Sequence, residues 1–342
     1  MTQIKECTQM DDLYDRLAAI GLPKKYIKEN ALPNWWCEEY EEESDAIVTA
    51  ASYISKLLNL DFKSLLDNTV QPKLILTSQP KFKVQKGSDL EQLPVASTIA
   101  AKVASVLAYG CQSPYRPIAG LTAANIRQEI LSSRRSVDLE GLLDFCWSYG
   151  IPVVHFSRFP SGSRKFQGMS ACFRQRPVIV LSLNSASPSR LLFILAHELG
   201  HILKGHLNLS SENVLVDEKV VLESIDEEEI EANEVAIELI TGYPDRSYCP
   251  ARNYNAKQLA IYAKQVGERD RVSPGVVALN YGWAKNHWGS TTDALKILEP
   301  NANAPLKINQ YVQGHLDWDR LGHDYQDYLE LVLGLESELE MR

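Results

Sequence analysis

The sequence predicts an α+β fold that is mainly helical, with a small β-sheet packed against one central helix. Segments with apolar residues at helical spacing occupy both ends of the chain, for example residues 45–66 and 318–335. Between residues 150 and 184, three short runs rich in β-branched residues are separated by Gly, Pro and Ser, which is typical of strands. A helix that is apolar nearly all round follows them directly, so we expect it to be buried.

The composition is that of an ordinary globular protein. The 342 residues are 45% hydrophobic and 23% charged, and the formal net charge is −9. This acidic balance disfavours a broad surface for nucleic acid. No apolar run reaches the roughly 18 residues of a membrane span, and the N-terminus lacks a signal-peptide pattern, so we expect a soluble cytoplasmic protein. Six scattered cysteines without a CxxC pair predict reduced thiols.

Three regions are expected along the chain. Residues 1–90 read as a helical N-terminal module that ends in a short hairpin or linker at about 72–92. A helix-turn-helix is conceivable there. However, residues 38–43 are strongly acidic, whereas a DNA-binding helix-turn-helix needs Lys and Arg near its recognition helix, so DNA binding is not favoured. Residues 91–250 hold the sheet and the central helix, and residues 251–342 form a helical C-terminal region.

The spacing of apolar residues predicts the helices and strands of residues 91–250 and 251–342. Two amphipathic helices, at 93–110 and about 122–147, are expected to form a helical bed before the sheet. The chain then changes to short runs typical of strands, at 150–157, 169–175 and 177–184. Beyond Pro244 the best helix candidates are 256–266, 274–283 and 318–335.

The central helix carries the pattern that points to chemistry. Residues 187–205 begin with Ser at an N-cap and Pro at the first helical position, and they end in Gly. His197, Glu198 and His201 lie within this helix, so two imidazoles share one face with a carboxylate beside them. Three polar residues on an apolar helix are costly unless a metal pairs them. We therefore expect one tetrahedral Zn²⁺ on His197 and His201, with Glu198 free as the general base.

A third protein ligand is expected from the acidic helix at residues 226–242. At about 100° per residue, Glu229 shares an apolar face with Asn233 and lies in the middle of it. The opposite, solvated face gathers the other glutamates, namely Glu227, Glu231, Glu234 and Glu238. A carboxylate at the centre of a buried face must be paired or bind a cation, so Glu229 is the expected third ligand and Glu231 the alternative. Asn233, one turn further along the helix, is placed to hydrogen-bond a His or Glu ligand and so to orient it toward the metal.

His206 invites a different interpretation, as a third histidine ligand. The extended metzincin pattern needs Gly at position 204 and His at position 207, where this chain has Lys204 and Leu207. His206 is therefore expected at the surface or behind the ligands. The remaining histidines lie in contexts that indicate structural roles: His155, His287, His315 and His323.

These segments resemble the ImmA/IrrE family of zinc metallopeptidases. The family's marks are RFTLAHELGH and a downstream E-x-x-A-N-x-F-A, and this chain has LLFILAHELGH followed by EIEANEVA. The resemblance covers about residues 150–245 and departs from the family pattern at two packing positions, Leu192 and Val235. The helical N-terminal piece with LPNWW is similar to modules that precede this domain in some relatives.

The resemblance implies a gluzincin-like domain with His197, His201 and Glu229 as zinc ligands and Glu198 as the catalytic base. It also implies a cytoplasmic regulatory protease whose protein substrate is a helix-turn-helix transcriptional repressor. We accordingly predict metal-assisted hydrolysis of a peptide bond. The strand at 177–184 is the expected sheet edge that aligns an extended substrate.

Two alternatives remain from the sequence. In the first, the chain is a transcriptional or protein-binding regulator whose zinc site is structural and whose helical arms recognise DNA or a partner protein. In the second, a non-peptidic hydrolase uses the same zinc triad. The intact base Glu198 favours the peptidase, because a purely structural zinc site needs no free carboxylate beside it.

Overall fold

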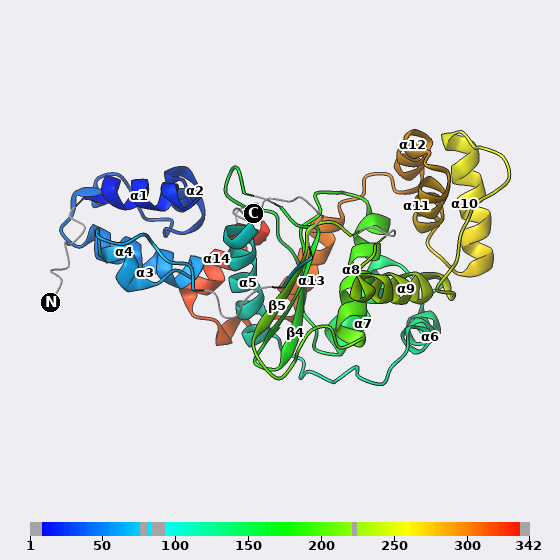
Figure 1. Ribbon diagram of the computed structural model, residues 1–342, viewed down its shortest axis with the longest axis horizontal. Helices are drawn as coiled ribbons and strands as arrows, with labels where there is room; N and C mark the ends of the chain where they lie inside the picture. The colour runs from blue at the N-terminus through cyan, green and yellow to red at the C-terminus, as the bar shows by residue number, and fades with distance from the viewer. Residues whose placement is uncertain (1–8, 76–80, 84–92, 164, 221–223, 336–342) are drawn as a thin grey trace, which may run out of the picture.

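Short helices build the N-terminal part of the protein. The computed structural model describes residues 9–75, 81–83, 93–163, 165–220 and 224–335 (Figure 1). The N-terminal elements are α1 (Met10–Ala19), α2 (Lys24–Asn30), the 3-10 turn η1 (Tyr40–Glu42), α3 (Ala46–Leu58) and α4 (Phe62–Leu66). The expected hairpin at 72–92 lies largely outside the described residues. Within this segment residues 81–83 form strand β1 (Lys81–Lys83), which pairs in parallel with a distant strand, and Leu74 makes an isolated bridge to Leu60.

The middle of the chain holds the sheet and the helices that cover it. In chain order these elements are α5 (Leu93–Gly110), α6 (Ala123–Ser133), α7 (Leu139–Ser148), β2 (Val153–His155), β3 (Gly168–Phe173), β4 (Arg176–Leu181), α8 (Pro188–Leu203), β5 (Asn213–Asp217) and α9 (Glu227–Thr241). The single helix expected at about 122–147 is two helices. The chain breaks at Asp138, whose side chain caps α7 by accepting a hydrogen bond from Gly141 N at 2.8 Å.

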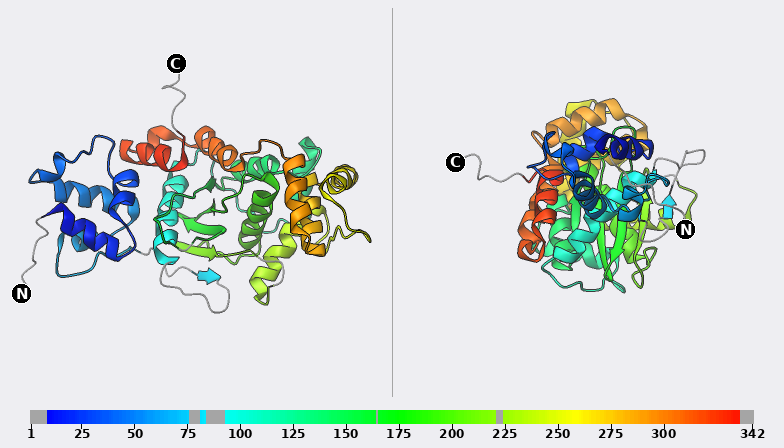
Figure 2. Two further views of the ribbon diagram at one scale, coloured as in Figure 1. Left: turned by 90° about the horizontal axis from the view of Figure 1, so that it is seen from above. Right: turned by 90° about the vertical axis from the view of Figure 1, so that its left-hand side faces the viewer.

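Helices also build the C-terminal part: α10 (Ala256–Asp270), α11 (Pro274–Lys285), α12 (Trp288–Leu298), α13 (Ala304–His315), the 3-10 turn η2 (Trp318–Arg320) and α14 (His323–Leu333). The molecule is elongated, with α1–α4 at one end, α10–α12 at the other and the sheet between them (Figures 1 and 2). No helix of the described residues has the length and apolar character to cross a membrane. The division into regions at residues 90 and 250 stays a prediction.

One five-stranded sheet lies at the centre, in the order β1-β5-β3-β4-β2. Strand β3 runs antiparallel to both of its neighbours, whereas β1 with β5 and β2 with β4 are parallel pairs. Helix α5 packs on one face of β3 and β4 and α8 on the other (Figure 1). Because both faces are covered, β3 is buried along its whole length and shows no alternation of apolar and polar residues. The fold class is therefore α+β and mainly helical, as expected.

The sheet order corrects one expectation about the substrate. Strand β4, within the segment 177–184, lies between β3 and β2 and has no free edge. An extended peptide therefore cannot add to it. The edge strands of the described sheet are β1 and β2. The expected edge is wrong because β2 pairs in parallel with the side of β4 that β3 leaves open.

Candidate metal centre

Helix α8 presents the two histidines from a buried position. Ser187 caps its N-terminus by accepting a hydrogen bond from Arg190 N at 3.3 Å, and Pro188 begins the helix. The carboxylate of Glu299 also accepts hydrogen bonds from Ser187 Oγ and from Ser189, which ties this terminus to the end of α12. Three turns further on, the side chains of His197, Glu198 and His201 are fully buried. A helix covered on all sides thus delivers polar groups to the interior.

Helix α9 approaches α8 closely and brings a carboxylate to the two imidazoles. At Gly200, a Cβ atom would lie 2.9 Å from the carbonyl oxygen of Ala232, so only glycine fits at this crossing. The close contact sets Glu229 opposite His197 and His201, with its side chain 8% exposed. The predicted apolar face of α9 is therefore the face that packs on α8.

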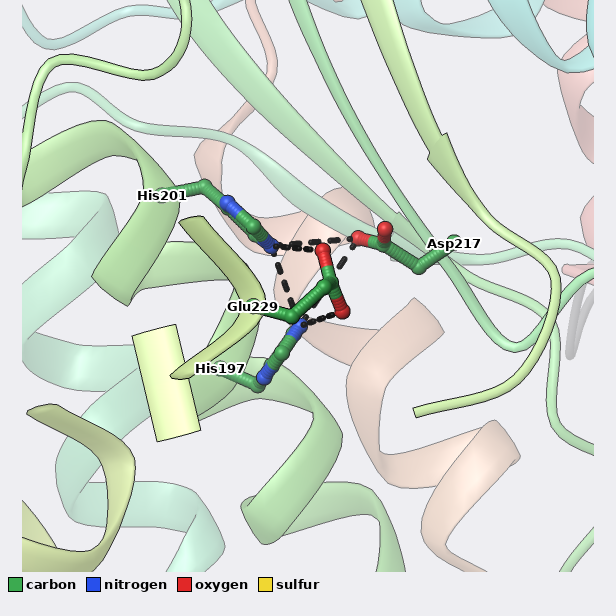
Figure 3. A group of neighbouring side chains, drawn as sticks. All are labelled: His197, His201, Asp217 and Glu229. Atoms are coloured by element: carbon green, nitrogen blue, oxygen red, sulfur yellow. Dashed lines mark hydrogen bonds and ion pairs between the residues drawn. The ribbon is translucent and has the colours of Figure 1, made fainter. Parts of the chain in front are cut away.

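The ligand atoms converge in one group (Figure 3). His197 Nε2 and His201 Nε2 lie 3.0 Å apart, and Glu229 reaches them with Oε2 at 3.4 Å and Oε1 at 3.3 Å, respectively. A fourth residue, Asp217 of β5, joins this group, and the donor atoms of all four lie within 4.8 Å of one another. We call these four residues the metal group. His197, His201 and Glu229 were expected from the sequence, and Asp217 was not.

A signal for Asp217 exists in the sequence but is weak. The residue ends the run Asn-Val-Leu-Val-Asp, where an acidic side chain follows three apolar residues that are all buried. A carboxylate at the end of a buried strand requires a partner. Without the strand pairing, however, nothing in the sequence distinguishes Asp217 from the acidic residues that follow it.

Outer partners fix the orientation of both imidazole rings. His197 Nδ1 donates to Asn233 Oδ1 at 3.0 Å, in the position expected for Asn233. His201 Nδ1 lies 2.9 Å from His206 Nδ1, and His206 Nε2 lies 2.9 Å from Glu231 Oε2. If His206 donates to Glu231, its Nδ1 accepts the proton of His201. Both Nε2 atoms then point their lone pairs into the metal group. In metal sites, hydrogen bonds to the other ring nitrogen orient a histidine ligand in this way.

This arrangement separates the roles of His206 and Glu231 from those of ligands. His206 lies behind His201 and not beside the ligand atoms, in the position that its sequence register indicates. Glu231, the alternative third ligand, contacts only His206 among the ion pairs of the described residues and is 48% exposed. Of the two carboxylates considered on α9, Glu229 is the one that joins the metal group.

The electrostatics of the group favour a cation. Burial lowers the pKa of His201 to about 4, so the ring is neutral at pH 7 and its lone pair is available. Burial raises the pKa of Glu198 to about 8 and, together with Glu198 and Glu229, raises that of Asp217 well above its usual range. Burial acts in the same direction on Glu229, but its contacts with His197 and His201 outweigh this and hold its pKa low. A dication among these donors would favour the ionised form of every carboxylate.

The donors also fit zinc chemically. Imidazole nitrogen and carboxylate oxygen are common zinc ligands, with bonds of about 2.0–2.2 Å. The Nε2 atoms of the two rings face each other at 3.0 Å, and in the tautomers with the proton on Nδ1 their lone pairs would repel each other. A cation between them removes that repulsion. His197, His201 and Glu229 therefore have the chemistry and the convergence that a zinc ion requires.

The surroundings of Glu198 suit a base and not a ligand. Its Oε2 accepts a hydrogen bond from Ser170 Oγ at 2.7 Å, whereas Oε1 accepts none from a hydroxyl, amide or basic group of the described residues, and the carboxyl group of Asp217 lies nearby. Room for this carboxylate is made by Gly168 of β3, where a Cβ atom would lie 1.9 Å from Glu198 Oε1. Ser170 and Gly168 were not expected from the sequence, because neither carries a signal until β3 is known to face α8.

Comparison with known proteins gives one match. Residues 148–280 match the family model Peptidase M78, described as the IrrE N-terminal-like domain. This match confirms the resemblance seen in the HELGH and E-x-x-A-N segments, and it includes the strands β2 to β5, α8 and α9. No curated protein and no solved structure matches the chain.

Proposed function

Because residues 148–280 match the Peptidase M78 family model, we propose that this protein is a zinc-dependent endopeptidase that cuts a regulatory protein. The observation that carries the proposal is the convergence of His197, His201 and Glu229 beside a buried carboxylate, Glu198, that is not one of the ligands. The three residues would hold one Zn²⁺ per chain. When bound, the ion supplies Lewis acidity toward a carbonyl oxygen and acidifies a water molecule.

Glu198 is the proposed general base, and its two oxygens have separate tasks. Oε2 is held by Ser170 Oγ, so Oε1 is the atom that takes a proton from water and passes it to the leaving amine. Burial raises the pKa of Glu198 to about 8, so positive charge nearby is needed to keep this base fully ionised at neutral pH, and His201, whose pKa burial lowers, does not supply that charge. This dependence couples the base to the metal.

An apolar cavity beside the helices of the metal group is the proposed site for a substrate side chain. Its volume is about 530 Å³. It is lined by both helices of the metal group and by α11 and α12, with side chains that include Phe193, Ile194, Ile237, Ile240, Trp283 and Trp288. Ile194 lies one turn before His197 on α8, so the cavity extends from the same helix face. A large apolar residue next to the cleaved bond suits this lining.

The finer identity of the substrate follows from the family resemblance, and we propose a helix-turn-helix transcriptional repressor. The alternative is a regulator in which a zinc site stabilises the fold and the helical arms bind DNA or a partner. The position of Glu198 supports the peptidase, because a structural zinc site has no use for a buried carboxylate outside its ligands.

Metal content and a base variant test the proposal together. After dialysis against a weak chelator, elemental analysis should find near one zinc per wild-type chain and much less in Glu229→Ala. Glu198→Gln should keep its zinc and lose hydrolysis, read as new protein N-termini formed in a cell lysate by zinc-loaded protein. Zinc-free wild type, or cleavage retained by Glu198→Gln, contradicts the proposal. Salt-sensitive binding to the chain's own promoter, by gel shift, is expected only for the regulator.

A further inference from the structure

Asp217 belongs to the metal group, yet the proposed reaction gives it no task. Its side chain is 1% exposed and lies at the end of β5, facing the two histidines (Figure 3). Strand β5 is paired on both sides, with Gly168 of β3 and Lys83 of β1 opposite Asp217. The backbone carbonyl of Asp217 also accepts a hydrogen bond from Gln167 N at 3.0 Å. The sheet therefore fixes where this carboxylate sits.

Among the described residues, no basic side chain other than an imidazole compensates this carboxylate. The carboxyl group of Glu198 lies within hydrogen-bonding reach of Asp217, but it is a second acid, and burial together with this acid raises the pKa of Asp217. The ion pairs that the described residues make with Asp217 and Glu229 go only to His197 and His201, and no Lys or Arg takes part. With Glu198, three buried carboxylates surround two imidazoles. A buried carboxylate without compensation is costly, and a divalent cation is the compensation that this set of donors suits.

The distances from Asp217 are close to those of a ligand. Four donors at about 2.0–2.2 Å from a tetrahedral zinc ion lie about 3.3–3.6 Å from one another. Asp217 Oδ2 lies 3.4 Å from His201 Nε2, within this range, and 3.9 Å from His197 Nε2, a little beyond it. The corresponding separations for Glu229, at 3.3 Å and 3.4 Å, fall within the range. A small movement of the Asp217 side chain would therefore bring its oxygen to the distance of a fourth ligand.

We propose that Asp217 is a fourth protein ligand and closes the metal site in the resting protein. The inference rests on the proposed zinc site and adds a regulation to it. A zinc ion held by four protein donors has no position for water, as in structural sites, whereas a catalytic site keeps one open. The chain is then a latent peptidase, and hydrolysis begins when Asp217 leaves the metal. Rotation of the Asp217 side chain would release the metal while β5 stays paired on both sides.

Two measurements on the full chain test this, and neither depends on hydrolysis. The first is zinc affinity by competition with a chromophoric chelator, for wild type, Asp217→Ala, Asp217→Asn and the exposed control Glu234→Gln. The second is the visible spectrum of the Co²⁺-substituted proteins titrated with acetohydroxamate, a small molecule that binds a metal with an open position. Asp217→Asn keeps the size of the side chain, and the titration of wild type requires no variant at all.

The expected results separate this inference from the proposed function. Asp217→Ala should bind zinc at least about tenfold more weakly than wild type and Glu234→Gln. Its Co²⁺ spectrum should respond to acetohydroxamate at concentrations that leave wild type unchanged. Equal zinc affinity in both Asp217 variants and wild type, or a wild-type spectrum that already responds, overturns the fourth ligand. If Glu229→Ala also keeps its zinc, the proposed metal site itself fails; if only the Asp217 variants keep it, that site stands.

Discussion

Gly200 of α8 lies against Ala232 of α9 so closely that a Cβ at Gly200 would be 2.9 Å from the Ala232 carbonyl oxygen and 3.0 Å from its Cα. Two small residues at one crossing let the helix axes approach. The approach sets the distance between the histidines of α8 and Glu229 of α9. The distances between the side chains of the metal group are therefore set in part by Gly200 and Ala232, which do not belong to that group.

Gly200→Ala should move the two helices apart and weaken zinc binding. The added methyl group meets backbone atoms, which cannot rotate away, so the cost in stability is about 1–3 kcal/mol. Zinc affinity by chelator competition and urea unfolding of the metal-free protein measure the two effects. The matched control is Gly289→Ala on α12, where a Cβ meets no atom within 4 Å and the helix gains stability if anything. Unchanged zinc affinity in Gly200→Ala would show that the crossing does not position Glu229.

Ser170→Ala should alter the pH dependence of hydrolysis more than zinc content. The hydrogen bond from Ser170 Oγ favours the ionised form of Glu198 and lowers its pKa. Because its loss raises that pKa, the acidic limb of the profile of kcat/KM should shift to higher pH, and activity below it should fall. The control is Ser105→Ala on α5, whose hydroxyl bonds only to the Lys102 carbonyl. An unshifted profile would remove Ser170 from the positioning of the base.

His206→Ala should weaken zinc binding without removing a ligand. His206 joins His201 to Glu231 through two contacts of 2.9 Å, and this chain holds the His201 ring with its Nε2 toward the metal group. Loss of such an outer partner typically costs about 10–100-fold in metal affinity. Chelator competition measures it, with Glu234→Gln as the exposed control. A loss as complete as that of Glu229→Ala would instead indicate that His206 binds the metal directly.

The parts of the site that lie on helices could be predicted from the sequence, because the helical period fixes which residues share a face. His197, His201 and Glu229 are brought together by the packing of two amphipathic faces. Asp217 could not be predicted because its position depends on the pairing of β5 with β3, and Ser170 and Gly168 could not because theirs depends on the packing of β3 against α8. Strand order depends on contacts between segments far apart in the chain. For the same reason, the sequence could not show that β4 lies inside the sheet and not at its edge.

Local chemistry likewise limited the prediction of the helices. The segment 122–147 has apolar residues at helical spacing throughout, yet the first helix ends at Ser133 and the second begins only after Asp138. The side chain of Asp138 accepts hydrogen bonds from Gly141 N and from Arg134. This helix cap starts a new helix although the apolar spacing continues unbroken across it. Periodicity predicts the buried face of a helix more reliably than its ends.

The turn between β3 and β4 stores strain that a single substitution should relieve. Arg174 and Gln175 connect the two strands with φ angles of 55° and 60°, and Phe173 pairs with Arg176. Both residues thus adopt the left-handed conformation of a type I′ turn, which costs about 1 kcal/mol or more for a residue with a Cβ. Gln175→Gly should therefore raise the free energy of unfolding by about 1 kcal/mol, measured by urea denaturation.

Gln175→Ala is the control for this prediction, since it removes the same polar group and keeps the Cβ that causes the strain. It should leave the free energy of unfolding near the wild-type value, so the difference between the two variants reports the backbone alone. Arg174 is left unchanged because its guanidinium lies 4.8 Å from the ring centre of Tyr109 on α5. Equal stability of the Gly and Ala variants would mean that the turn is not strained, or that the unfolded chain gains as much freedom as the folded turn releases.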